Sequence, residues 1–78
     1  MSNNESKKMN LYIINNVLSD YTSGMAVIAA ESKEQCRELF IAEFSEYHSR
    51  DFDEFGKFTV IENVQHEAGV VDYVYGGG

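Results

Sequence analysis

Three side chains in this sequence belong to the types that most often act in catalysis or bind metals, namely Cys36, His48 and His66. A zinc site needs three or four cysteine, histidine or carboxylate ligands held together, and neither histidine has such partners at a ligand spacing. Nucleophilic catalysis by Cys36 would need a histidine base beside it. On a helix, His48 would lie about a third of a turn around from Cys36 and about three turns along the axis. We therefore expect no metal, no cofactor and no enzymatic activity, and we expect Cys36 to be a buried, unreactive side chain.

Carboxylates are the other groups in this sequence that could do chemistry, and they draw attention at two places. Asp53 and Glu54 are adjacent, but nothing around them indicates a pocket, so as a general acid and base pair they are better explained as surface charge. Glu43 interrupts an apolar pattern, where a carboxylate must be paired, solvated or neutral. Three interpretations of Glu43 stay open: its head group reaches solvent at the edge of the apolar side, it bonds to Tyr12 or Tyr73, or it recognises a partner.

The element that must position most of these residues is a helix, which we predict over Ser32–Ser49. Ser32 followed by Gln35 is a capping-box signature, in which the hydroxyl accepts from a first-turn amide and the glutamine side chain reaches back. At about 100° per residue, apolar side chains gather on one side of the helix. They are Cys36, Leu39, Phe40, Phe44 and Tyr47. This side is the surface that we expect to pack on the rest of the chain.

Short strand patterns surround the predicted helix. They predict strands over residues 9–18, 25–30, 58–64 and 70–75. Both sides of the first strand are apolar, which predicts a central position in the sheet. Turn signals at residues 19–24 and 66–69 predict two hairpins and therefore antiparallel neighbours, while the order of the strands stays open. The expected fold is α+β in the order ββαββ, a four-stranded, mainly antiparallel sheet with one helix packed on one face.

Length and composition place further bounds on the protein. The 78 residues allow one small domain, which we place at residues 9–78 after a flexible polar lead of residues 1–8. Five Phe and five Tyr within a 44% apolar composition argue for a folded core. No apolar run approaches ~18 residues, and the start of the chain lacks the apolar centre of a signal peptide, so we expect no membrane span and no export. A single cysteine suits a reducing cytoplasm.

The net charge of −7 lies entirely in the second half of the chain. Residues 38–78 contain nine acidic side chains but only two basic ones, Arg50 and Lys57, whereas acids and bases balance in residues 1–37. Direct binding to nucleic acid is disfavoured, because it depends largely on lysine and arginine. A protein with a basic surface is the natural complement, although an acidic surface also serves simply to keep a small protein in solution.

The chain ends in three glycines that follow an apolar strand pattern. This ending resembles the tails of ubiquitin-like and thiamine-pathway sulfur-carrier proteins, whose terminal Gly-Gly carboxylate is activated and transferred. The resemblance implies that Gly77 and Gly78 would carry the reacting group, since the narrow channel of an activating enzyme admits no side chains. Proteins of that class usually have a longer region after the helix, with a further strand.

A second resemblance covers most of the chain. The parts that carry it are LYII at residues 11–14, the DY-containing turn at residues 20–21, AVIAAESKEQCRELF at residues 26–40 and EAGVVDYVYGGG at residues 67–78. In these parts the chain is similar to very small proteins encoded by bacteriophages and prophages, which include a type I-F anti-CRISPR inhibitor that occupies the DNA-binding surface of its target. The resemblance implies a viral protein that acts against a host defence protein inside the bacterial cell.

These observations lead to three hypotheses about function. The leading one is a non-enzymatic phage or mobile-element protein that inhibits a host defence or nucleic-acid-processing protein, with carboxylates in place of phosphates and aromatic side chains as anchors. The partner-binding residues expected on this basis are Glu43, Glu46, Tyr47, Asp51, Phe52, Asp53, Glu54 and Phe55. The second hypothesis is the sulfur carrier or ubiquitin-like modifier. The third is a small structural or oligomerising protein, and a monomer and a small homo-oligomer both stay open.

Overall fold

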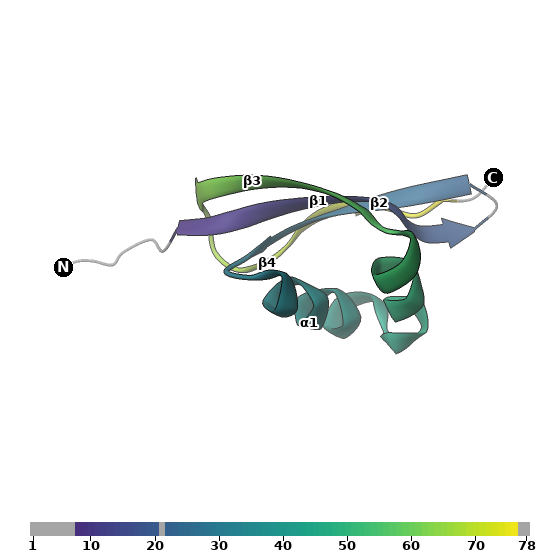
Figure 1. The fold of residues 1–78 in the computed structure, drawn as a ribbon. Helices are drawn as coiled ribbons and strands as arrows, with labels where there is room; N and C mark the ends of the chain where they lie inside the picture. Colours follow the sequence, from purple (N-terminus) through teal and green to yellow (C-terminus); the bar gives the residue numbers. More distant parts are fainter. Residues whose placement is uncertain (1–7, 21, 77–78) are drawn as a thin grey trace.

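The computed structural model describes residues 8–20 and 22–76, and in it a four-stranded sheet carries a helix and two short helical turns on one face (Figure 1). The elements in chain order are β1 (Lys8–Asp20), β2 (Thr22–Ala30), α1 (Lys33–Phe44), the 3-10 turn η1 (Glu46–His48), the π-helical turn η2 (Asp51–Phe55), β3 (Lys57–Gln65) and β4 (Gly69–Val74). The α+β fold class is confirmed. Residues 1–7 of the expected lead lie outside the described residues, and Lys8 already belongs to β1.

The strand order is β3-β1-β2-β4, and all neighbours are antiparallel. The first predicted hairpin is confirmed, because β1 pairs with β2. The second is wrong, because β3 pairs with β1 and β4 pairs with β2. Residues 66–68 therefore cross the end of the sheet from one edge to the other, a span of about 14 Å that a few extended residues can cover. Turn residues indicate a change of direction, but they do not say which strand the chain meets next.

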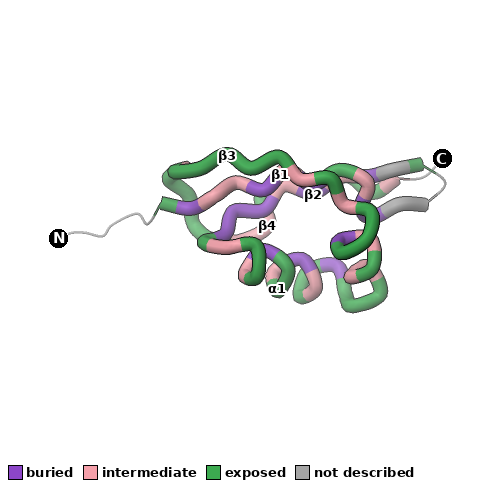
Figure 2. Tube along the Cα trace, in the orientation of Figure 1, coloured by how far each residue is buried: buried purple, intermediate pink, exposed green. Residues whose placement is uncertain are grey.

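The two central strands hold the sheet's contribution to the core. On the side that faces α1, Tyr12 and Ile14 of β1 lie opposite Ile28 and Ala26 of β2, and all four are buried. Figure 2 shows this buried layer along β1, β2 and the inner side of α1. The prediction that the first strand is central is confirmed, and the apolar character of both of its faces is the reason that it was recognisable.

The alternation of side chains between the two faces of the sheet is interrupted near the end of β1. Asn16 and Leu18 have positive φ angles of 64° and 54°, and the pairing with β2 shifts register on either side of Val17. Simple alternation predicts Val17 and Leu18 on opposite faces of the sheet, but both are fully buried. Each irregularity in the pairing re-aims the next side chain, so two consecutive apolar residues reach the core.

The helix α1 begins as its sequence predicts and ends earlier. The Ser32 hydroxyl accepts a hydrogen bond from the Gln35 amide at 3.1 Å, and the Gln35 side chain accepts one from the Glu31 amide at 2.6 Å. The helix ends at Phe44 because Ser45 has a φ angle of 86°, which no α-helix accommodates. The predicted end at Ser49 is therefore wrong.

An aromatic cluster joins the helical layer to the sheet. The Phe40 ring centroid lies 5.0 Å from that of Phe44 and 5.1 Å from that of Phe52, and Phe52 lies 5.0 Å from Phe58 of β3. Phe52 is only 2% exposed, whereas Phe55 is 53% exposed. Of the two phenylalanines in η2, Phe52 alone packs into the core, because η2 points the two rings in different directions.

Two glycines allow the end of the chain to pass close to the first hairpin. The Gly76 amide donates a hydrogen bond to the Leu18 carbonyl at 2.9 Å. A Cβ at Gly24 would lie 2.7 Å from the Gly76 nitrogen and 2.8 Å from the Val17 oxygen, and a Cβ at Gly76 would collide with the Thr22 carbonyl. The first of the three terminal glycines is therefore required by packing.

Phe40 offers a direct test of the core. Replacing Phe40 by Ala should lower the free energy of unfolding by about 3–5 kcal/mol, because the fully buried ring would leave a cavity among its aromatic neighbours. Phe55→Ala is the matched control, since it removes the same ring from an exposed position and should cost below about 1 kcal/mol. Urea unfolding followed by circular dichroism measures both. A loss below about 1 kcal/mol for Phe40→Ala would show that this ring is not part of the core.

Candidate partner-binding surface

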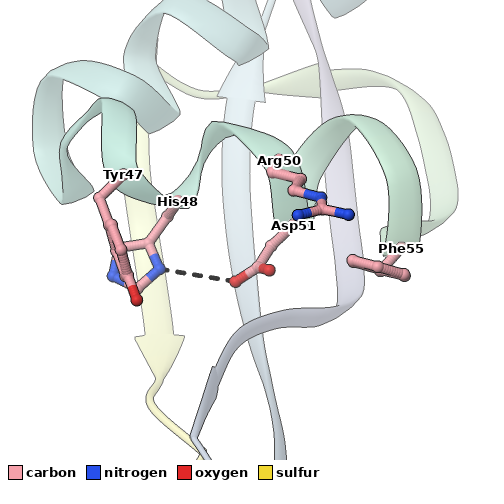
Figure 3. A pocket seen from close by; sticks show the side chains of 5 residues that line it. All are labelled: Tyr47, His48, Arg50, Asp51 and Phe55. Atoms are coloured by element: carbon pink, nitrogen blue, oxygen red, sulfur yellow. Dashed lines mark ion pairs between the residues drawn. The ribbon is translucent and has the colours of Figure 1, made fainter.

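The two helical turns after α1 surround an open hollow of about 380 Å³, which we call the hollow. The side chains that line it are Tyr47, His48, Arg50, Asp51 and Phe55 (Figure 3). All five come from one short stretch of chain, from η1 to the end of η2. Three of them, Tyr47, Asp51 and Phe55, belong to the expected partner-binding residues.

The local sequence explains why the hollow forms. Ser45 turns the chain out of α1, and the buried Phe52 ties η2 to the core. The Gly56 amide donates to the Asp51 carbonyl at 2.8 Å, five residues back, which is the wide turn of a π-helix. Phe55 therefore lies on the outer side of η2 while Phe52 lies on the inner side.

Exposed aromatic rings stand on both sides of the hollow. Tyr47 is 87% exposed and Phe55 is 53% exposed. The Tyr47 ring meets the His48 ring edge-on at 5.1 Å, and this contact holds it at the rim (Figure 3). Large exposed aromatic side chains are the residues that most often anchor protein interfaces. Tyr47 was expected on the apolar side of the helix, and it lies outside because the helix has already ended.

Asp51 and His48 form the polar floor of the hollow. The His48 Nδ1 atom lies 3.5 Å from an Asp51 carboxylate oxygen, and the two side chains are only 18% and 24% exposed. Figure 3 shows them facing each other between the two aromatic rings. A histidine balances a carboxylate only when it is protonated. Asp51 is therefore a half-buried carboxylate. Its one ion-pair partner in the described chain, His48, is positively charged only in its protonated form.

Two other carboxylates of η2 already have an arginine. Arg37 donates from two nitrogens to the two Asp53 carboxylate oxygens, each at 2.8 Å, and so ties η2 to α1. This hydrogen bonding holds the pKa of Asp53 below its usual value and raises that of Arg37. Arg50 donates to Glu54 at 3.3 Å. Both pairs are exposed and contribute little to stability, but they reduce the charge that Asp53 and Glu54 offer to a partner.

Glu43 and Glu46 lie near the hollow without lining it, and both are exposed. No ion pair of either carboxylate occurs within residues 8–20 and 22–76, and in this part of the chain Glu43 makes no hydrogen bond to Tyr12 or Tyr73. The exposed position agrees with the interpretation that the Glu43 head group reaches solvent at the edge of the apolar side.

The expected partner-binding residues are thus only partly brought together. Phe52 must be removed from this surface as a correction, because its ring is in the core and cannot contact a partner in the folded chain. His48 and Arg50 line the hollow and were not among the expected residues. The spacing of His48 to Asp51 and of Arg50 to Glu54, three and four residues, would have indicated both pairs if residues 46–55 had been treated as helical turns.

The other groups that the sequence suggested as functional sites are weaker candidates than the hollow. Cys36 is fully buried, and within the described residues no three metal-ligating side chains gather. Gly77 and Gly78, which the sulfur-carrier hypothesis needs, lie outside the described residues. No helix in residues 8–20 and 22–76 is long and apolar enough to cross a membrane.

Comparisons of the chain with models of protein families, with curated proteins and with solved structures found no match.

The buried thiol gives a pH-dependent prediction. Burial raises the pKa of Cys36 from 9.0 to about 12, with a smaller opposing effect from Lys33. Because the folded pKa is the higher one, the stability that this group contributes is present below about pH 9 and is lost as the pH rises further. Between about pH 8.5 and 10.5, wild type should lose up to about 2 kcal/mol more than Cys36→Ala. Urea unfolding at both pH values measures the difference, and equal losses in the two proteins would contradict the prediction.

Proposed function

We propose that this protein is a non-enzymatic binding module that docks the hollow, and the acidic side chains near it, on a basic surface of another protein. The observation that carries the proposal is Asp51, a half-buried carboxylate between two exposed aromatic rings, whose one ion-pair partner among the described residues is the His48 imidazole at 3.5 Å. Such an arrangement suits an incoming cation with an apolar stem.

A lysine or arginine side chain of the partner fits this chemistry. Its charged end would pair with Asp51, and its methylene groups or guanidinium plane would lie against Tyr47 and Phe55. The contact would be partly desolvated, because the Asp51 side chain is only 24% exposed, and charge pairs gain strength where water is excluded. The hollow is therefore the centre of the proposed interface.

The charge around the hollow supports the same kind of partner. Glu43 and Glu46 add exposed negative charge at the end of α1 and in η1, and residues 38–78 carry the whole net charge of −7. Such a field speeds the encounter with a basic surface and loses strength as salt is added. Among the expected acidic residues, Asp51, Glu43 and Glu46 would contribute most, since Asp53 and Glu54 are paired with arginines.

The narrower proposal concerns the identity of the partner. We propose a host defence or nucleic-acid-processing protein, inhibited by a phage-encoded or mobile-element protein whose carboxylates take the places of DNA phosphates. Two observations support it, the likeness to small phage and prophage proteins and the acidic second half of the chain. The proposal requires that nucleic acid and this protein compete for one basic surface of the partner.

The test begins with capture of host proteins from a bacterial lysate, followed by binding measurements with the captured protein. Wild type should bind a basic protein, and Asp51→Asn or Tyr47→Ala should weaken this binding by about tenfold or more. Glu67→Gln is the matched control, because Glu67 follows the far end of β3 whereas η2 precedes the start of that strand, and it should weaken binding far less.

Two outcomes would contradict the proposal at different levels. Unchanged affinity of Asp51→Asn and Tyr47→Ala would show that the hollow is not the binding surface. Simultaneous binding of nucleic acid and this protein to the captured partner would leave the binding module in place but would exclude phosphate mimicry. Salt titration of the same binding reaction measures the electrostatic share.

A further inference from the structure

Among the described residues, helical elements cover one face of the sheet and leave the other uncovered. In Figure 1 the helix and the helical turns lie below the sheet, and no described element lies above it. Side chains alternate along strands, so the residues between Tyr12, Ile14, Ala26 and Ile28 point to the uncovered side.

The uncovered side is mostly apolar, although Asn15 and Thr59 also lie on it, and we call it the open face. Its apolar residues are Leu11 and Ile13 of β1, Met25 and Val27 of β2, Ile61 of β3 and Val74 of β4. The register places them side by side, because Leu11 pairs with Ile61, Ile13 with Val27 and Met25 with Val74.

An apolar open face is unusual for a sheet that meets water. An antiparallel sheet with one solvated face normally carries polar residues on that face. Here Ile61 is 46% exposed and Val74 is 57% exposed, at opposite edges of the same surface. Between these two residues, Leu11, Ile13, Met25 and Val27 are partly exposed, and an apolar surface of this kind marks an interface.

The charged residues on the open face indicate which kind of protein binds there. A basic partner would find little to pair with here, because the charged residues among the paired positions of the open face, within residues 8–20 and 22–76, are Lys57 on β3 and Asp72 on β4. The positive charge of Lys57 and the negative charge of Asp72 balance each other. A second copy of this chain can approach such a surface despite a net charge of −7, because α1, η1 and η2 with their carboxylates lie on the other side of the sheet (Figure 1).

The positions of Lys57 and Asp72 favour a particular symmetry. Lys57 pairs with Asn15 on one edge of the sheet, and Asp72 pairs with Val27 on the other edge. A two-fold axis parallel to the strands lays β3 of one copy over β4 of the other. Each Lys57 then lies about two residues, roughly 7 Å, along the strand from the partner subunit's Asp72, within reach of a lysine side chain.

We propose that two copies of this chain form a symmetric dimer, with the open faces stacked on each other about 10 Å apart as in a β-sandwich. The face is small, about 19 Å across four strands and about 20 Å along them, which is below the standard size of a stable interface. The dimer therefore depends on concentration. Its helical layers point outward, so the two hollows remain accessible on opposite sides.

Sedimentation velocity over about a hundredfold range of concentration tests the dimer. The apparent mass of wild type should rise from 8.8 kDa towards twice that value. Ile61→Glu should remain a monomer throughout, because it places a carboxylate in the apolar contact. Val60→Glu is the matched control, since Val60 is the neighbouring residue on the same strand, is 44% exposed and points to the opposite face. It should dimerise as wild type does.

The charged pair gives a second, independent arm. Lys57→Glu should weaken the dimer by about tenfold, because it sets two acids opposite each other, and adding Asp72→Lys should restore it. Circular dichroism checks that each variant is folded. A wild type that stays monomeric at the highest concentration overturns the proposal. So does an equal effect of Val60→Glu and Ile61→Glu, which would place the contact at the sheet edge or elsewhere. Neither result bears on the hollow.

Discussion

The contact of Phe52 with Phe40 and Phe58 is the interaction on which the helical side of this molecule depends. Its ring lies about equally close to the helix and to the edge strand, at 5.1 Å and 5.0 Å. The positive φ angle of Ser45 turns the chain away from α1. The packing of Phe52 is the contact that holds the following turn, η2, against the sheet. Because Phe52 is fixed inside, its neighbours in η2 must face outward, which brings Asp51 and Phe55 to the hollow.

Features with a local cause could be predicted from the sequence. The cap at Ser32 depends on residues within one turn, and the buried positions Cys36, Phe40 and Phe44 follow from the helical period. The end of α1 could not be predicted in this way, since the apolar pattern continues to Tyr47 while the backbone turns at Ser45. Strand order also escaped prediction, because it depends on long-range pairing rather than on turn residues.

The candidate site was predictable in composition and only partly in arrangement. The acidic and aromatic character of residues 46–55 is plain in the sequence, but which acids remain unpaired depends on the fold. Arg37 reaches Asp53 across sixteen residues, and no local pattern indicates that pair. Phe52 and Phe55 look equivalent in the sequence, yet the π-helical turn buries one and exposes the other.

The edge-to-edge connection between β3 and β4 has a consequence for the order of folding. Neither strand can form a hairpin with the other, so each must find its place against strands made much earlier in the chain. The β1–β2 hairpin and α1 use mostly local contacts, whereas Leu11 must wait for Ile61 and Met25 for Val74. Contacts of such high sequence separation slow the search for the native state. During synthesis, the β1 edge of the hairpin would therefore stay unprotected until β3 has left the ribosome, and the β2 edge until β4 has left it.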